Sequence, residues 1–311
     1  MSKVLSLSSA ILIAFSFSAV SQASSLLVSY STATGGGVEM FSLVPQSAGS
    51  LYASADAPIN TITTAGNSAY WATSTQIYAD SLDDATGGTA KTALPSIPFA
   101  GITVNDLAVS PSTNSYLVGW IAPGYGWFIG QYPLSPADGA YSVFVNAANP
   151  IQGLTIADGK VYWIEDVRVL SQNLDGTGKA QIQQLGAGVV LNDLAVDPAS
   201  QTYFLAASAP PLPPLIARYP LSPNASGNLI TFGTTSIKAL TIADDRAYWI
   251  DGSSVWSERL NGTDVVLQET LPAQYTLTDL AIAVNAPEPG TWAMLGGGLV
   301  LLGLGKLRRR A

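Results

Sequence analysis

Short hydrophobic segments separated by turn residues run through most of the chain. Residues 161–164 and 167–172, for example, are rich in aromatic and aliphatic side chains, and they lead into a turn at 173–177 that contains Asp and Gly. Runs of β-branched and aromatic residues bounded by Gly, Asp and Asn predict short β-strands. No helical periodicity interrupts these segments between residues 24 and 286, so the pattern predicts an all-β fold.

The predicted strands belong to a repeated unit. The motif Asp-Leu-Ala followed by an aliphatic residue begins at Asp106, Asp193 and Asp279, so the chain repeats itself about every 87 residues. The pentapeptide Tyr-Pro-Leu-Ser-Pro, at 132–136 and 219–223, keeps the same interval. Each unit divides into two related halves of about 43 residues with four short strands apiece, which is typical of a β-propeller blade.

The two ends of the repeated region determine the number of blades. Segments 26–30 and 38–44 match the later strands of a blade, but nothing before them supplies its first strand. That strand is found at 278–282. A C-terminal strand that completes the N-terminal blade closes the ring and hides two open sheet edges. We therefore predict six blades, near 26–58 with 276–284, 59–100, 101–148, 149–187, 188–235 and 236–275.

Alternate blades carry a Tyr-Trp pair, at Tyr70-Trp71, Tyr162-Trp163 and Tyr248-Trp249. The segments Tyr162-Trp163-Ile164-Glu165 and Tyr248-Trp249-Ile250-Asp251, each followed by a strand and a Leu-Asp/Asn-Gly turn, resemble blades of the YWTD family of six-bladed β-propellers. The Thr-Asp half of the motif is only partly kept, and the other three blades lack Tyr-Trp. The resemblance therefore implies the fold rather than a receptor-type function.

The N-terminal segment has the pattern of a secretory signal peptide. Lys3 precedes an apolar run at 11–20, and small residues lead to Ala23. A positive start, a short apolar middle and a small-residue exit predict cleavage after Ala23. We accordingly divide the chain into a signal peptide at 1–23, a propeller body at 24–286 and a C-terminal tail at 287–311.

The tail has three parts in a fixed order. Pro287-Glu288-Pro289 is followed by a Gly- and Leu-rich apolar segment, 291–307, and by the basic residues Lys306, Arg308, Arg309 and Arg310. This order resembles a PEP-CTERM sorting tail. The resemblance implies export in a Gram-negative bacterium, temporary anchoring in the inner membrane by a short transmembrane helix, recognition by an exosortase-type processing enzyme, and delivery to the cell surface or the extracellular polysaccharide. An ordinary C-terminal anchor would explain the helix and the arginines but not Pro-Glu-Pro.

The composition of the body excludes several classes of function. Residues 24–286 carry 20 acidic and 8 basic side chains, a net charge of −12, which argues against nucleic acid or an anionic membrane surface as a partner. The whole chain has no His and no Cys. It therefore cannot contain a His-based catalytic triad, a His or Cys transition-metal site, or a disulfide.

Two sets of repeated residues are candidates for chemistry. Exposed Tyr-Trp pairs could stack on sugar rings, but their recurrence at one blade position favours packing, with one member of each pair between neighbouring blades. Asp106, Asp193 and Asp279 could form an acidic ring that binds Ca²⁺ in the central channel. The alternative that we favour is that each accepts backbone N–H bonds from an adjoining turn. The acidic pairs Glu165-Asp166 and Asp244-Asp245 are interpreted as solvated turns.

Three loops differ from one another while the strands around them keep the repeat. They lie at 32–37, 122–126 and 209–214, between the second and third strands of the blades without Tyr-Trp. Loops on a rigid scaffold commonly carry function, and these three should emerge on one face of the ring. Tyr125 and Trp127 are the first candidates for a ligand contact. The competing explanation is that the loop sequences diverged because no function constrains them.

These observations favour a non-enzymatic, exported propeller that binds a polymer or protein of the cell envelope or extracellular matrix and requires no cofactor. The alternative is a hydrolase or lyase that acts on polysaccharide or a lactone through channel carboxylates and a divalent cation. A matrix component without a specific ligand is a third interpretation.

Overall fold

The structure is a computed structural model that describes residues 24–82, 91–95, 97, 101–135 and 141–284. The expected signal peptide with its cleavage site at Ala23, the Pro287-Glu288-Pro289 motif, the apolar segment 291–307 and the basic cluster from Lys306 to Arg310 lie outside the described residues. Within the described ranges, no helix is long and apolar enough to span a lipid bilayer.

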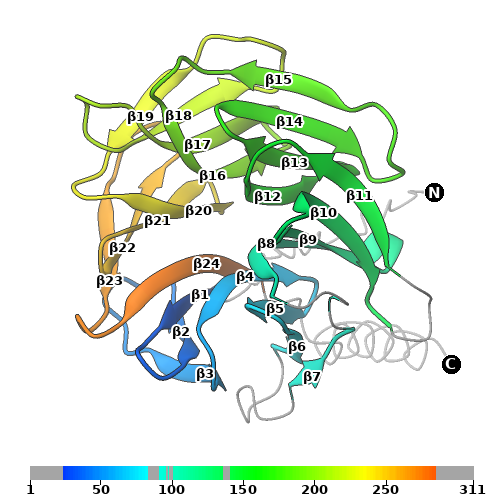
Figure 1. Cartoon of the computed structure of the whole chain (residues 1–311). Coiled ribbons are helices and arrows are strands. Elements are labelled where there is room, and N and C mark those ends of the chain that lie inside the picture. Colours follow the sequence, from blue (N-terminus) through cyan, green and yellow to red (C-terminus); the bar gives the residue numbers. More distant parts are fainter. Residues whose placement is uncertain (1–23, 83–90, 96, 98–100, 136–140, 285–311) are drawn as a thin grey trace, which may run out of the picture.

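Six four-stranded antiparallel sheets surround a central axis, as Figure 1 shows. The first three blades are blade 1 with β24 (Thr276–Val284), β1 (Ser24–Ser31), β2 (Gly36–Ser42) and β3 (Ser50–Ala55); blade 2 with β4 (Ile59–Ala65), β5 (Ser68–Thr73), β6 (Ile77–Ser81) and β7 (Thr92–Ala93); and blade 3 with β8 (Thr103–Ser110), β9 (Ser115–Ala122), β10 (Gly126–Pro133) and β11 (Ser142–Ala147). A 3-10 turn, η1 (Pro111–Thr113), connects β8 to β9.

The second half of the chain repeats this arrangement. It forms blade 4 with β12 (Ile151–Ala157), β13 (Lys160–Glu165), β14 (Arg168–Asn173) and β15 (Ala180–Gln184); blade 5 with β16 (Val190–Asp197), β17 (Thr202–Ser208), β18 (Leu215–Pro220) and β19 (Asn228–Phe232); and blade 6 with β20 (Ile237–Ala243), β21 (Arg246–Asp251), β22 (Ser254–Arg259) and β23 (Val266–Thr270). The first strand of each blade is innermost, because these six strands contact one another around the axis. The predicted all-β, six-bladed propeller is confirmed.

The ring closes through β24 and β1, which pair antiparallel. Their register places Val28 opposite Leu280 and Leu26 opposite Ile282. Blade 1 thus takes its innermost strand from the C-terminal end of the body and its other three strands from the N-terminal end. In Figure 1 the orange β24 lies beside the blue β1. The prediction that a C-terminal strand completes the first blade is confirmed.

The hydrophobic core consists of six wedges, one between each pair of neighbouring blades. The tryptophans of the Tyr-Trp pairs fill three of them: Trp71 between blades 1 and 2, Trp163 between blades 3 and 4, and Trp249 between blades 5 and 6. The tyrosines fill the other three: Tyr70 between blades 2 and 3, Tyr162 between blades 4 and 5, and Tyr248 between blades 6 and 1. None of these six side chains is more than 9% exposed, so they pack rather than present a sugar-stacking surface.

From the sequence, one member of each pair was expected between blades, and the structure places both there. Successive side chains of a strand point to opposite faces of its sheet, and both faces of a blade are covered by neighbouring blades. Each Tyr-Trp pair therefore supplies two wedges, one on either side. Three pairs suffice for six wedges, which explains why alternate blades need none.

Tyrosines of the other blades complete two of the wedges by stacking. Tyr116 stacks on Tyr132 with ring centroids 5.2 Å apart, and Tyr203 stacks on Tyr219 at 5.4 Å. Tyr132 and Tyr219 are the first residues of the repeated Tyr-Pro-Leu-Ser-Pro segments. Such aromatic pairs contribute about 0.5–1.5 kcal/mol beyond the burial of their area. The repeated pentapeptide thus marks a packing requirement.

Removal of a wedge tryptophan should destabilise the whole ring. We expect Trp163→Ala to lower the free energy of unfolding by about 3–5 kcal/mol, because it leaves a large cavity between blades 3 and 4. The matched control is Phe232→Ala, since Phe232 is 46% exposed, and its effect should stay within about 0.5 kcal/mol. Urea unfolding of the full chain in mild detergent, followed by tryptophan fluorescence and far-UV circular dichroism, measures both. Equal losses in the two variants would contradict the wedge role.

Candidate functional site

The central channel is a cavity of about 770 Å³ bounded by the six inner strands. Each inner strand contributes a polar side chain at an equivalent level: Asn60, Asn105, Gln152, Asn192, Lys238 and Thr278. Amide and hydroxyl groups dominate this level, and Lys238 is the one basic residue in the described lining. The channel is therefore a polar space, in contrast to the apolar wedges around it.

A β-bulge interrupts every inner strand at this level of the channel. In β12, for example, the pairing with β13 shifts between Gln152 and Thr155, and Gly153 adopts a φ of +53°. A bulge leaves backbone groups of the extra residue without a ladder partner. Those groups need other hydrogen-bond partners, because unpaired backbone N–H and C=O groups are costly inside a protein.

The three repeated aspartates provide those partners across the gap between blades. Asp193 of blade 5 accepts the N–H of Leu240 on β20 at 2.6 Å and that of its own neighbour Leu194 at 2.7 Å. The other two carboxyls repeat this pattern, Asp106 with Leu154 and Leu107, and Asp279 with Ile62 and Leu280. Each aspartate thus ties its own blade to the inner strand of the next.

An asparagine beside the aspartate binds the other side of the same bulge. Asn192 Nδ2 donates to the carbonyl of Ile237 at 2.9 Å, and Asn105 Nδ2 donates to the carbonyl of Ile151 at 3.3 Å. The Asn-Asp dipeptide therefore satisfies both a C=O and an N–H of the neighbouring inner strand. We call this arrangement the Asn-Asp clamp. In blade 1, Thr278 replaces the asparagine, and its hydroxyl lies 2.8 Å from Ser29 Oγ.

These contacts agree with the interpretation that the aspartates accept backbone N–H bonds, but the donors differ from those expected. One donor of each pair lies on the inner strand of the adjacent blade and the other is the next residue of the aspartate's own strand, so neither lies in a turn. Within the part of the chain that the structure describes, no three His, Cys, Asp or Glu side chains come close enough to hold a metal ion. The Ca²⁺ hypothesis for Asp106, Asp193 and Asp279 stays a prediction, and these hydrogen bonds compete with it.

All three clamp carboxyls have raised pKa values. Burial raises the pKa of Asp106 to about 6, against the opposing effect of the N–H bonds from Leu154 and Leu107. Burial and the charge of Asp106 raise the pKa of Asp279 to about 7. Burial, followed by the charges of Asp106 and Asp279, raises the pKa of Asp193 well above its ordinary value. Electrostatic repulsion between the carboxylates across the channel therefore contributes to the raised pKa values of Asp193 and Asp279.

Two acidic residues at the end of the Tyr-Trp motif, Glu165 and Asp251, also have a structural role, and for Glu165 the expectation from the sequence was wrong. It was interpreted as part of a solvated turn, yet Glu165 is 3% exposed, accepts the N–H of Ala148 at 3.1 Å and pairs with Arg168 at 2.8 Å. At the equivalent place in blade 6, Asp251 accepts N–H and O–H bonds from both Thr234 and Thr235. Burial opposes ionisation there, but these bonds outweigh it and lower the pKa of Asp251 to about 2.

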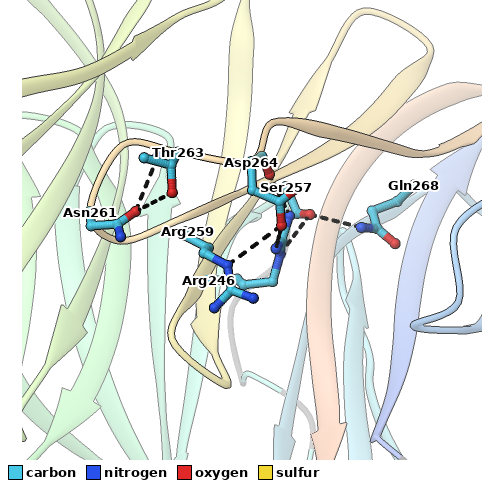
Figure 2. A network of polar contacts seen from close by, with 7 residues as sticks. All are labelled: Arg246, Ser257, Arg259, Asn261, Thr263, Asp264 and Gln268. Atoms are coloured by element: carbon cyan, nitrogen blue, oxygen red, sulfur yellow. Dashed lines mark hydrogen bonds and ion pairs between the residues drawn. The ribbon is translucent and has the colours of Figure 1, made fainter.

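A polar network at the opposite edge of blade 6 joins its three outer strands (Figure 2). Arg246 binds Asp264 at 2.7 Å and donates from Nε to Ser257 Oγ at 3.1 Å, and Gln268 donates to the same hydroxyl at 2.7 Å. Arg259 lies 3.5 Å from Asp264. Because both arginines bind the same carboxylate, this cluster closes the turn between β22 and β23.

The variable loops take the places that the sequence predicts. They connect β1 to β2, β9 to β10 and β17 to β18, so they leave equivalent strands at the same face of the ring. Tyr125 lies in the turn between β9 and β10, where its N–H donates to Ala122 and Gly124 has a φ of +80°. Its side chain is 78% exposed. Trp127, the other predicted contact residue, is half-buried and packs on the wedge between blades 3 and 4.

Solved structures with a similar fold include proteins of diverse origin. A chain in the crystal structure of a nidogen/laminin complex matches with a TM-score of 0.68 and 15% identity, covering 85% of this chain and 100% of that one. A putative TolB from Agrobacterium tumefaciens matches with a TM-score of 0.61, 13% identity and coverages of 81% and 90%. TolB from Acinetobacter baumannii matches with a TM-score of 0.62, 12% identity and coverages of 84% and 66%. No protein-family model and no curated protein matches the sequence. At these identities the likeness shows the fold alone.

The clamp makes a testable contribution to stability. At pH 5 we expect Asp193→Ala to lower the free energy of unfolding by about 1–3 kcal/mol, because two backbone N–H groups lose their acceptor and channel water replaces it only in part. Asp56→Ala serves as the control, since Asp56 is an exposed carboxylate between β3 and β4. Urea denaturation of the full chain in mild detergent gives the comparison. If both variants unfold at the same urea concentration, the clamp has no energetic role.

Proposed function

We propose that the protein is an exported, non-enzymatic binding protein of the cell envelope or the extracellular polysaccharide matrix, and that it contacts its ligand through the loop face. The observation that carries the proposal is Tyr125, a large aromatic side chain that is 78% exposed at the tip of a turn between two rigid strands. Tyrosine offers broad contact area at a small cost in conformational entropy, and exposed aromatic rings bind both sugars and proteins.

The state of the channel carboxylates supports binding over catalysis. A hydrolase or lyase reaction in the channel would need Asp106, Asp193 or Asp279 as an acid, a base or a cation ligand. Each of these carboxyls already accepts two backbone N–H bonds, one from its own strand and one that holds it to the inner strand of the neighbouring blade. A residue in such a structural role cannot change its geometry without disturbing the ring.

The sequence of the tail supports the proposed location. Pro287-Glu288-Pro289, the apolar segment and the arginines together suit a precursor that is anchored in the inner membrane and then recognised by an exosortase-type processing enzyme. A chain of the same fold takes part in a nidogen/laminin complex, which illustrates that such a ring can serve in assembly with another protein. The net charge of −12 on residues 24–286 disfavours nucleic acid as a ligand.

The ligand contact is testable with one exposed side chain. We expect Tyr125→Ala to weaken binding of the full chain, held in mild detergent, to polysaccharide from a producing strain by about tenfold, as for a central aromatic contact. Leu229→Ala is the control, because Leu229 is 51% exposed on the outer strand β19, away from the loop face. Biolayer interferometry measures both. Unchanged affinity for Tyr125→Ala, or equal loss in both variants, would contradict the proposed contact.

The proposed sorting is tested separately in a host that carries an exosortase-type enzyme. We expect mass spectrometry of the mature protein to find a C-terminus from which the basic cluster Arg308–Arg310 has been removed. Replacement of Pro287, Glu288 and Pro289 by Ala should leave the full-length chain in the membrane fraction. An ordinary anchor would instead keep its arginines in both proteins, which would overturn the sorting proposal and leave the binding proposal standing.

A further inference from the structure

One hydroxyl group lies between two of the clamp carboxyls. Thr61 Oγ1, on β4, is 2.8 Å from Asp279 Oδ2 and 3.0 Å from Asp106 Oδ1. Asp279 lies on the preceding inner strand and Asp106 on the following one, so the hydroxyl bridges the two blades on either side of blade 2. Both distances are those of O–H···O hydrogen bonds.

The number of hydrogen atoms in this bridge is one short if both carboxyls are ionised. A threonine hydroxyl carries a single proton and can donate it to one acceptor, while its lone pairs can only accept. An ionised carboxylate has no proton to give. With both aspartates ionised, one of the two short contacts would therefore bring oxygen lone pairs together without a hydrogen between them. A proton on either carboxyl removes this conflict, because each of the two contacts then contains one hydrogen atom and is a hydrogen bond.

We propose that Asp106 and Asp279 share one proton through the Thr61 hydroxyl, and that this proton makes closure of the ring sensitive to pH. In one arrangement Asp106 donates to Thr61 Oγ1, and Thr61 donates to the Asp279 carboxylate. In the other, both donations are reversed. Asp279 belongs to β24, the strand that closes the ring, so the shared proton acts where the two ends of the body meet.

The surroundings of the bridge determine how firmly the proton is held. Of the inner strands packed around it, β16 contributes Asp193 and β20 contributes Lys238, while the described channel residues of β12 and β4 include no ionisable group. Asp193 opposes ionisation of the pair and Lys238 favours it. Burial is the largest cause of the raised pKa values of Asp106, about 6, and Asp279, about 7. These directions agree with a proton retained in mildly acidic conditions.

The bridge is a departure from the approximate threefold repeat. At the positions equivalent to Thr61, the other two Tyr-Trp blades have Gly153 and Ala239. A Cβ atom at Gly153 would lie 2.7 Å from the backbone nitrogen of Leu194 and 3.0 Å from Asp193 Oδ1, so that position has no room for a threonine. Only one of the three equivalent places in the described channel therefore carries a bridging hydroxyl, and it joins the carboxyls of Asp106 and Asp279.

The sign of the pH effect follows from the raised pKa values. An unfolded Asp has a pKa of about 3.9, so above that pH the folded protein holds a proton that the unfolded chain has lost. Its stabilising effect is fully present below about pH 4 and is lost as the pH rises through about 6 to 7. For each such proton the unfolding equilibrium constant rises about tenfold per pH unit between about pH 4 and about pH 6, and it levels off above the folded pKa.

The experiment compares unfolding of the full chain, in mild detergent, from about pH 4 to about pH 8. An asparagine at position 106 cannot ionise, and its amide nitrogen can donate to Thr61 Oγ1. That nitrogen leaves the N–H of Leu107 without its acceptor, a loss that is the same at every pH. We expect the unfolding constant of the original protein to rise between pH 4 and pH 8 about a hundredfold more than that of Asp106→Asn, since the folded pKa of about 6 lies two units above the unfolded value. Asp56→Asn, an exposed control, should rise as the original protein does. An equal rise in Asp106→Asn and in the original protein would overturn the proposal.

A double-mutant comparison separates a shared proton from simple relief of repulsion. If one proton is shared, Asp106→Asn, Asp279→Asn and the double variant all gain about the same stability at pH 8 when each is measured relative to its own value at pH 4 and compared with the original protein. In a Thr61→Val background the relay is missing, so the two gains should add. Additive gains in the presence of Thr61 would show two independent acids and would refute sharing. Infrared spectra at pH 6 provide a second readout, because the shared proton predicts a protonated-carboxyl band that Asp106→Asn and Asp279→Asn each remove.

Discussion

The antiparallel pairing of β24 with β1 joins the two ends of the propeller body, and the other features depend on it. Without this pairing, blade 1 would lack its inner strand, and two sheet edges would be open. The channel would lose one of its six walls, and the wedges on both sides of blade 1 would lose residues of β24 such as Leu280 and Ala281. The clamp residue Asp279 reaches blade 2 only because β24 occupies this place.

The two kinds of blade depend on each other in complementary ways. Blades with Tyr-Trp provide one large aromatic ring for every wedge, since the two members of a pair point to opposite faces. Blades without the pair provide the aspartates that satisfy the bulged inner strands of their neighbours. The repeat of about 87 residues is therefore the smallest unit that contains both devices. The loops at 32–37, 122–126 and 209–214 are free to vary, because they contribute neither the wedge aromatic rings of the Tyr-Trp pairs nor the aspartates that bind the inner strands.

The sequence predicted those features of the fold that recur in every repeat. It did not predict contacts made by a residue that is present in only one repeat. The spacing of Asp106, Asp193 and Asp279 predicted equivalent positions, and the strand at 278–282 predicted how the ring closes. Thr61 gave no signal, because Gly153 and Ala239 stand at the equivalent places and only coordinates bring it between two carboxyls. Glu165 was misinterpreted as solvent-exposed, because an acidic residue in a turn-rich segment is normally so, whereas here Ala148 and Arg168 satisfy it. The same limit applies to Trp127, whose half-buried state depends on blade 4.

The closed ring can be tested most directly by hydrogen exchange of the backbone amides of β24, measured by mass spectrometry at neutral pH. Amide groups that are paired in the central strands of a cooperative fold exchange only through large-scale unfolding. The account predicts that peptides covering Thr276–Val284 exchange as slowly as those covering Ile151–Ala157, the equivalent innermost strand of blade 4. Exchange of the first peptides within seconds, while blade 4 remains protected, would mean that the ring is open and would contradict the account.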